Sequence, residues 1–243
     1  MGPVRRLLGL AIGVLIVAAQ AGCGGGAASS SGAVSGALTV AATTAEAPLT
    51  TVPKRSKVAF PAKTGTDVVR LATLRPVGRV SYDVTVGNGT SYTLDVASDD
   101  HHALLHQKQA TGEVWIGLDV NRGAVQFMCT AQAGGGPTCQ AGDKSGNAAK
   151  TAAAIARILG NSFIHATFDP VAASAGPDVG VGPDTQIGLD VSCLAASAPE
   201  DLRLCATRQG YITQLSAGPT SILATTVEPV ISQSELDPPV AVK

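Results

Sequence analysis

Residues 80–96 read VSYDVTVGNGTSYTLDV, and this stretch decides the fold of the chain. Apolar residues alternate with polar ones on both sides of the central Gly-Asn-Gly-Thr at 87–90. Asn-Gly between two alternating runs is the strongest short-range signal for a β-hairpin, because both residues tolerate the positive φ of a type I′ turn. Each run has one apolar and one polar face, which predicts an antiparallel sheet packed on one side.

Further stretches are rich in β-branched and other apolar residues and are also predicted to be strands. They are residues 113–118, 124–129, 186–193, 202–207, 211–215 and 221–227. Together with the hairpin, they would give most of the chain to β-structure.

Two stretches are predicted to be helices. Within residues 67–74 the apolar side chains have helical spacing, and a proline two positions later ends the run. Residues 147–159 are Ala-rich, free of Gly and Pro, and followed by a glycine. Strands on both sides of such an insertion predict one continuous antiparallel sheet with helices on its apolar face, an α+β fold.

The composition of the 243-residue chain limits its core and its partners. Hydrophobic residues make up 45% of the chain, whereas aromatic residues make up 3% and charged residues 14%. The core must therefore consist mainly of Ala, Val, Leu and Ile, among which alanine buries little area. The net charge is −1 and no dense basic stretch occurs. Attraction to phosphate backbones is thus lacking, and nucleic acid is not expected to be a partner.

The first 22 residues have the layout of an export signal. Arg5 and Arg6 precede an uncharged, mostly aliphatic run at 7–19. This run is too short to cross a hydrocarbon core of about 30 Å as a helix, since about 20 residues are needed. Its length and flanks suit the apolar region of a signal peptide.

Cys23 follows Ala21 and Gly22, an order that resembles the end of the bacterial lipobox. In that motif, small residues precede a cysteine that receives diacylglycerol before the signal is removed. The match departs at Gln20, where the motif usually has an aliphatic residue. We expect cleavage after residue 22 and a lipid on Cys23, which would hold the protein on the extracytoplasmic side of the cell membrane. The alternative is an ordinary cleavable signal.

Residues 23–57 are predicted to be a flexible tether. Gly, Ala, Ser and Thr dominate this segment, so little apolar area is available to offset the entropy cost of ordering it. Residues 58–243 would then form one β-rich domain, which we expect to be a monomer.

The other four cysteines indicate an oxidising compartment. Cys129 and Cys139 lie 10 residues apart. Cys193 and Cys205 lie 12 residues apart. Each pair flanks a turn between strand-like runs, where a bridge across a hairpin is sterically allowed. Three connectivities are open, of which we favour the two local pairs; the spacings do not fit zinc knuckles, and an exported chain keeps its disulfides.

The order of these segments resembles a known family. After the lipobox, the tether and a helix come VSYDVTVGNGTSYTLDV at 80–96 and VQFMCTAQAGGGPTCQ at 125–140. The pattern continues with IGLDVSCLAASAPEDLRLCATRQGYITQL at 187–215 and closes with ILATTVEPVISQSELDPPV at 222–240. Over residues 60–240 the chain is similar to actinobacterial lipoproteins related to the LolA- and LppX-type (LppX/LprG-like) lipid and lipoprotein carriers. The resemblance implies a curved half-barrel sheet with helices that close a hydrophobic cavity.

The same resemblance implies a non-enzymatic carrier of a lipid or acylated ligand, without cofactor or catalytic motif. A cavity on the apolar face of the early strands would be lined by Tyr82, Val84, Val86, Tyr92, Leu94, Val96 and Ile116. An apolar void stays dry until an apolar ligand enters it. The alternative is a filled core, in which case the protein would be a structural or protein-interaction lipoprotein of the envelope.

Three other features carry weaker hypotheses. His101, His102 and His106 could share a metal if they lay on a helix, but their stretch is expected to be a strand end or turn, so no metal is expected. Residues 180–182, Gly-Val-Gly, precede a proline rather than a helix and are expected to be a loop. Trp115 is out of phase with the apolar positions of its strand. We expect it on the outer sheet face, as a partner or membrane contact or packed under a loop.

Overall fold

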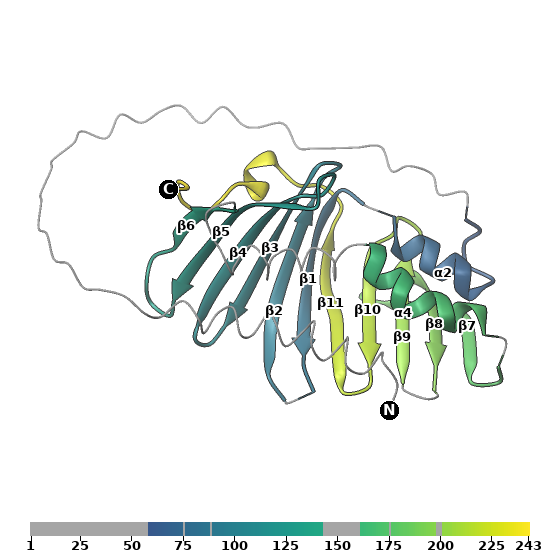
Figure 1. The fold of residues 1–243 in the computed structure, drawn as a ribbon. Coiled ribbons are helices and arrows are strands. Elements are labelled where there is room, and N and C mark those ends of the chain that lie inside the picture. The colour runs from purple at the N-terminus through teal and green to yellow at the C-terminus, as the bar shows by residue number, and fades with distance from the viewer. Residues whose placement is uncertain (1–57, 75, 88, 143–160, 175, 198–200) are drawn as a thin grey trace, which may run out of the picture.

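The computed structural model describes residues 58–74, 76–87, 89–142, 161–174, 176–197 and 201–243. The predicted signal peptide, Cys23, the tether and the predicted helix at 147–159 lie outside the described residues. Within these ranges, eleven strands form one antiparallel sheet with two α-helices packed against it (Figure 1). The predicted α+β architecture is therefore confirmed.

The strands are β1 (Gly78–Thr85), β2 (Ser91–Ser98), β3 (His102–Gln109), β4 (Gly112–Asp119), β5 (Ala124–Gln132), β6 (Thr138–Ala141), β7 (Val179–Gln186), β8 (Leu189–Ala196), β9 (Leu202–Thr207), β10 (Ile212–Ala217) and β11 (Thr220–Glu228). Their order across the sheet is β6-β5-β4-β3-β2-β1-β11-β10-β9-β8-β7. β1–β6, the first half-sheet, and β7–β11, the second half-sheet, are each a meander. They join where β1 pairs with β11, so the earliest and latest strands meet at the centre.

The hairpin predicted at residues 80–96 is confirmed, but its predicted turn type was wrong. β1 pairs with β2 with Val84 opposite Tyr92. The Val86 N–H donates to the Thr90 carbonyl at 2.9 Å, and the Gly89 N–H donates to the Val86 carbonyl at 2.8 Å. Gly89 has a φ of +82°. The loop therefore has three residues with glycine in the left-handed region, instead of the two residues of a type I′ turn.

Helix α2 (Gly65–Ala72) confirms the helix predicted at 67–74, two residues closer to the N-terminus. Thr64 caps it, because its hydroxyl accepts the Asp67 N–H at 3.2 Å. Helix α4 (Asn161–Ala173) was not predicted, and Pro170 inside it argues against a helix from sequence alone. A Cβ on Gly65 would lie 2.8 Å from the Cα of Ala172, so the glycine allows α2 and α4 to touch.

The main core lies on the face of the sheet that contacts the helices, here named the helix face. Its largest cluster joins both half-sheets to α2 and α4, and Leu71, Phe168 and Leu204 are fully buried in it. In Figure 1 the helices cover strands of the second half-sheet. The outer face carries smaller clusters. One of them packs Ile231, and Leu236 of the 3-10 helix η2 (Gln233–Leu236), against β2. None of the described helices is long and apolar enough to span a membrane.

Three strands differ from the sequence prediction. β3 was expected to be a strand end or turn, because its His, Gln and Lys residues obscure the alternation. The loop predicted at 180–182 is wrong, since these residues belong to β7, an edge strand, where glycine and proline are tolerated. β8 begins at Leu189 instead of 186, because Ile187 and Gly188 form the preceding turn with φ values of +48° and +76°.

Candidate functional site: an apolar pocket on the helix face

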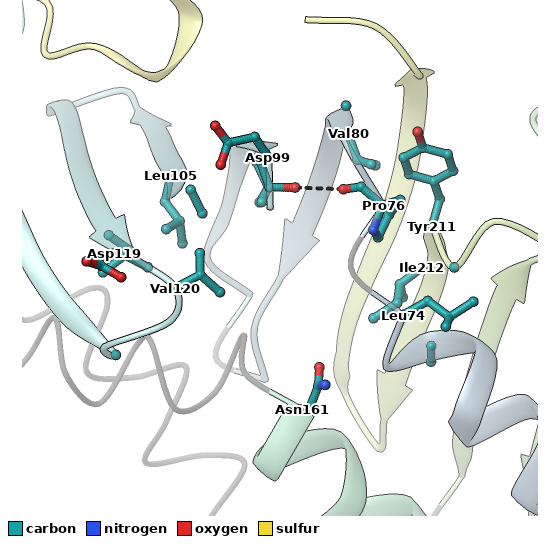
Figure 2. Close-up of a pocket in the computed structure, with 18 residues that line it drawn as sticks. Leu74, Pro76, Val80, Asp99, Leu105, Asp119, Val120, Asn161, Tyr211 and Ile212 are labelled. Carbon is teal, nitrogen blue, oxygen red and sulfur yellow. Dashed lines mark hydrogen bonds between the residues drawn. The ribbon is translucent and has the colours of Figure 1, made fainter. Parts of the chain in front are cut away.

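A pocket of about 190 Å³ lies between the first half-sheet, the segment after α2 and the start of α4 (Figure 2). Its apolar wall consists of Leu74, Val80, Val96, Leu105, Leu118 and Ile212. These residues come from β1, β2, β3, β4, β10 and the end of α2, so the pairing of β1 with β11 is needed to assemble the pocket.

Three uncharged polar side chains line the pocket, and each has a partner within the protein. The Ser98 hydroxyl donates to the Pro76 carbonyl at 3.0 Å. The Asn161 amide donates to the Thr73 carbonyl at 2.9 Å. The Tyr211 hydroxyl donates to a backbone carbonyl of the segment before β1, and burial raises the pKa of this tyrosine. The pocket therefore keeps an apolar character despite these groups.

Two carboxylates at the edge of the pocket are held by turns. Asp99 accepts the N–H groups of His101 and His102, both at 2.6 Å. Burial alone would raise the pKa of the Asp99 carboxyl, but these hydrogen bonds and the His102 ring outweigh burial and lower it. Asp119 accepts the N–H groups of residues 121 and 122 at 3.0 Å and 2.9 Å. Both side chains thus serve the local backbone.

The residues predicted to line a cavity all lie on the helix face, but only Val96 lines the described pocket. The others are packed in the adjoining core: Tyr82, Val84, Val86, Tyr92, Leu94 and Ile116. Tyr82 donates its hydroxyl to the Ile212 carbonyl at 3.1 Å. Burial raises the pKa of Tyr82 and raises that of Tyr92 to about 12. These side chains belong to the packed core and do not line the pocket.

Sequence reasoning missed most of the pocket wall. Leu105 belongs to β3, where no alternation marks the strand: Leu104 and Leu105 are adjacent, and the residue two positions after Leu105 on the same face is the polar Gln107. Leu74 and Ile212 come from elements far apart in the chain, and only the tertiary pairing places them side by side.

Gln107 is a polar residue buried on the helix face. It is 3% exposed and lies opposite Leu94 of β2 and Val114 of β4. Among the residues that the structure describes, neither its Oε1 nor its Nε2 has a hydrogen-bond partner. A buried unsatisfied polar group costs about 1–3 kcal/mol. Gln107 is therefore a position at which a polar atom of a ligand would be stabilising.

The three histidines do not converge. His106 points to the outer face, stacks on Trp115 at 4.4 Å between ring centroids, and has its Nε2 2.6 Å from a Glu113 carboxylate oxygen. His102 Nδ1 lies 3.5 Å from Asp99, and His101 Nδ1 lies 2.8 Å from Asn121 Nδ2. In the part of the chain that the structure describes, no group of three such residues could hold a metal ion.

The structure contains two disulfides, and they are the two local pairs favoured from sequence. Cys129–Cys139 joins β5 to β6, and Cys193–Cys205 joins β8 to β9. In both cases the cysteines are directly opposite each other across the strands. Such bonds persist in oxidising compartments outside the cytoplasm.

The comparisons with known proteins add a structural likeness. No family model matches the sequence, and no curated protein matches it. The chain is similar to a solved structure entitled "Crystal structure of MucB in complex with MucA(peri)", with 14% identity and a TM-score of 0.35. The alignment covers 72% of this chain and 58% of that chain. The present chain thus spans less than two thirds of the length of that protein.

Proposed function

We propose that the protein is a membrane-anchored envelope lipoprotein that binds an apolar chain of an amphiphilic ligand. One observation carries the proposal: most of the pocket wall is apolar, and its polar side chains already have protein partners. These side chains are Ser98, Asn161, Tyr211 and the carboxylates Asp99 and Asp119. Water in such a cavity would find few hydrogen-bond partners, whereas a hydrocarbon chain is stabilised there by leaving water.

The size of the pocket limits what it can take. An engineered apolar cavity of roughly 150 Å³ binds benzene, whereas sites for drug-sized ligands span about 300–1,000 Å³. At about 190 Å³, this pocket suits the end of one acyl chain or a ring. Burial of about five methylenes would contribute about 4 kcal/mol.

The buried amide of Gln107 favours a ligand that carries a polar group. It lies two residues along β3 from Leu105 on the same face, a distance of about 7 Å along the strand. A carbonyl, ester or hydroxyl group at this distance from a buried chain end could pair with the free amide atoms. The proposed ligand is therefore an acyl chain with a polar linkage, rather than a pure hydrocarbon.

A lipid on Cys23 would keep this domain at the membrane, on the side where disulfides persist. Metabolic labelling with a fatty-acid analogue tests the anchor. We expect incorporation in the wild type and none in Cys23→Ala, with Cys139→Ala as the matched control that stays labelled. A wild type that takes up no label would leave an ordinary cleavable export signal as the correct interpretation, and a label that persists in Cys23→Ala would contradict Cys23 as the site of the lipid.

Blocking the pocket tests the binding function. Ala103 faces the pocket from β3, so Ala103→Phe should fill it and abolish uptake of a fluorescent fatty acid. Ala131→Phe on β5 is the matched control and should bind like the wild type, because Ala131 lies outside the pocket.

Native mass spectrometry of the same variants provides the second measurement. Lipid that co-purifies with the wild type and the control, but not with Ala103→Phe, supports the proposal. An empty wild type that also fails to take up the fluorescent fatty acid would contradict it, and the protein would then be an envelope interaction protein with a filled core.

A further inference from the structure

The two disulfides lie in different chemical surroundings on the outer face. Cys129–Cys139 is buried among apolar side chains that include Phe127 and Trp115. In the described ranges, no N–H group donates to either of its sulfurs. Reduction of this bond would therefore create thiols without local stabilisation.

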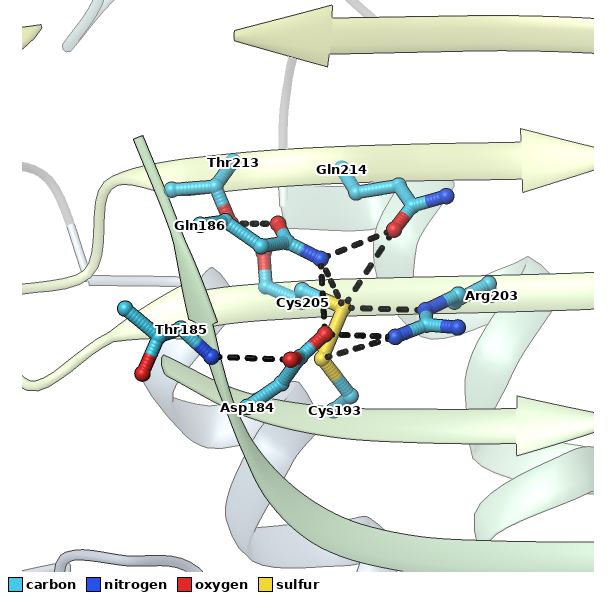
Figure 3. A network of polar contacts seen from close by, with 8 residues as sticks. All are labelled: Asp184, Thr185, Gln186, Cys193, Arg203, Cys205, Thr213 and Gln214. Carbon is cyan, nitrogen blue, oxygen red and sulfur yellow. Dashed lines mark hydrogen bonds and ion pairs between the residues drawn. A yellow bond between two sulfur atoms is a disulfide. The ribbon is translucent and has the colours of Figure 1, made fainter. Parts of the chain in front are cut away.

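Cys193–Cys205 is instead surrounded by donors (Figure 3). Gln186 Nε2 lies 3.4 Å from Cys205 Sγ, and Arg203 Nε lies 3.5 Å from the same sulfur. Arg203 Nη2 lies 4.0 Å from Cys193 Sγ. The Thr213 hydroxyl donates to Gln186 Oε1 at 2.6 Å and fixes the amide beside the disulfide, where Nε2 also donates to Gln214 Oε1 at 2.9 Å and to Asp184 Oδ2 at 3.3 Å. All three donor contacts converge on the sulfur pair.

These contacts favour the reduced form. N–H donors and a guanidinium stabilise a thiolate much more than an uncharged disulfide sulfur. Gln214 Oε1 accepts from Gln186 Nε2 at 2.9 Å and lies 3.8 Å from Cys205 Sγ, so it can accept a second hydrogen bond when this sulfur is a protonated thiol. Asp184 acts in the opposite direction, because its carboxylate holds Arg203 Nη2 at 2.7 Å and balances part of the positive charge.

We propose that Cys193–Cys205 is a thiol–disulfide exchange site for a dithiol reductant, with Cys193 as the attacked sulfur and Cys205 as the leaving group. Both the exposure of the two cysteines and the positions of the hydrogen-bond donors support this assignment. Cys193 is 6% exposed whereas Cys205 is fully buried, and the two closest donors are directed at Cys205. The Arg203 side chain is 41% exposed, so it can swing aside without opening the core.

The exchange balances with one dithiol per disulfide. A reductant thiolate forms a bond to Cys193 Sγ while the Cys193–Cys205 bond breaks, and Cys205 leaves with the electron pair as a thiolate. The second reductant thiol then attacks its own sulfur in the mixed disulfide and releases Cys193. The reductant is oxidised to a disulfide, and its two thiol protons end on the two protein cysteines.

Redox titration of the folded full-length chain tests the proposal, with Cys129–Cys139 as the internal reference. The chain is equilibrated at stepped ratios of reduced to oxidised dithiothreitol and alkylated, and the peptides of each cysteine pair are quantified separately. We expect Cys193–Cys205 to be half reduced at a ratio at least about tenfold lower than Cys129–Cys139, a difference of about 30 mV. Reduction of both bonds together would overturn the proposal, because it would indicate opening through global unfolding.

Variants of Arg203 and Asp184 should shift the dithiothreitol ratio at half reduction in opposite directions. Arg203→Gln should raise the required ratio for Cys193–Cys205 by about tenfold, and Asp184→Asn should lower it several-fold. Arg79→Gln is the matched control, because Arg79 is also an ion-paired arginine, with a side chain 38% exposed, but lies away from the disulfide. Unchanged ratios in both Arg203→Gln and Asp184→Asn would overturn the role of the donors.

Trapping identifies the attacked sulfur. A thioredoxin-type reductant that lacks its resolving cysteine should stay bound as a mixed disulfide, and peptide mapping should place the bond on Cys193. A mixed disulfide on Cys205 would overturn the assigned order. The test is independent of ligand uptake by the pocket, so the two proposals can fail separately.

Discussion

The two half-sheets share one plan but differ in what covers them. Each is an antiparallel meander, and each carries one disulfide across a hairpin on its outer face. The second half-sheet lies under α2 and α4, whereas the first contributes most of the apolar pocket and the unpartnered Gln107. Both half-sheets are buried on the helix face, and the candidate binding residues lie mainly in the first.

The disulfides extend this difference to the outer face. In the first half-sheet the bond is packed against the apolar side chains of Phe127 and Trp115. In the second it is enclosed by Gln186, Arg203 and Gln214, which can respond to reduction. The same covalent bond at nearly the same sequence separation thus acquires a different chemistry from its neighbours.

The largest expected effect on stability comes from truncating the buried side chain that packs α4 against the sheet. Phe168 of α4 is fully buried, so Phe168→Ala should lower the free energy of unfolding by about 3–5 kcal/mol. Urea titration followed by circular dichroism measures it. Leu223→Ala on β11, where the side chain is 42% exposed, is the control and should cost less than about 0.5 kcal/mol. Similar losses in both variants would show that the helices contribute little to stability.

Much of this architecture could be predicted from local pattern. The alternation at residues 80–96 identified the central hairpin, and the cysteine spacings identified both bridged hairpins. The failures have local causes: β3 contains two histidines and two glutamines, β7 contains Gly180 and Pro183, and α4 contains Pro170. In each case tertiary packing overrides a weak or contrary propensity.

The candidate site was less predictable than the fold. Alternation identified which side chains face the helices, including Val96, but could not tell a filled core from a pocket. That distinction depends on how Leu74, Ile212 and Tyr211 approach β1, and the approach is set by the pairing of β1 with β11. The donors around Cys193–Cys205 also come from separate strands, so spacing along the chain could not reveal them.

An intermediate effect should separate the two disulfides by stability. In a Cys193→Ala/Cys205→Ala chain, reduction of Cys129–Cys139 should lower the free energy of unfolding by about 2–3 kcal/mol, as expected for a short loop. In a Cys129→Ala/Cys139→Ala chain, reduction of Cys193–Cys205 should cost less, because its donors stabilise the reduced native form. A tenfold difference in redox equilibrium corresponds to about 1.4 kcal/mol.

Urea titrations with and without dithiothreitol measure both losses, and the alanine chains serve as each other's control. Equal losses in the free energy of unfolding would contradict the proposed chemical difference between the two disulfides. A larger loss at Cys193–Cys205 would reverse it, because its surroundings would then favour the oxidised form.

The smallest expected effect is a pH dependence confined to the first half-sheet. Burial lowers the pKa of His106 on β3, and Lys108 adds to this, whereas Glu113 on β4 and Asp95 on β2 act in the opposite direction without overcoming it. The unfolded chain, with an ordinary histidine pKa of about 6.5, therefore binds this proton more readily than the folded chain. The stability linked to His106 is complete above about pH 6.5 and is lost as the pH falls toward its folded-state pKa.

His106→Phe tests this effect, because it keeps an aromatic ring beside Trp115 and removes the titration. Between about pH 5 and 7 the variant should lose less stability than the wild type, because a phenyl ring gains no proton in the unfolded chain. Urea titrations at about pH 8, where histidine is neutral in both states, measure the packing change alone and serve as the control. If the free energy of unfolding changed in parallel with pH in the two chains, the pH dependence would come from groups other than His106. The outer face of the first half-sheet would then respond to neither protons nor reductants.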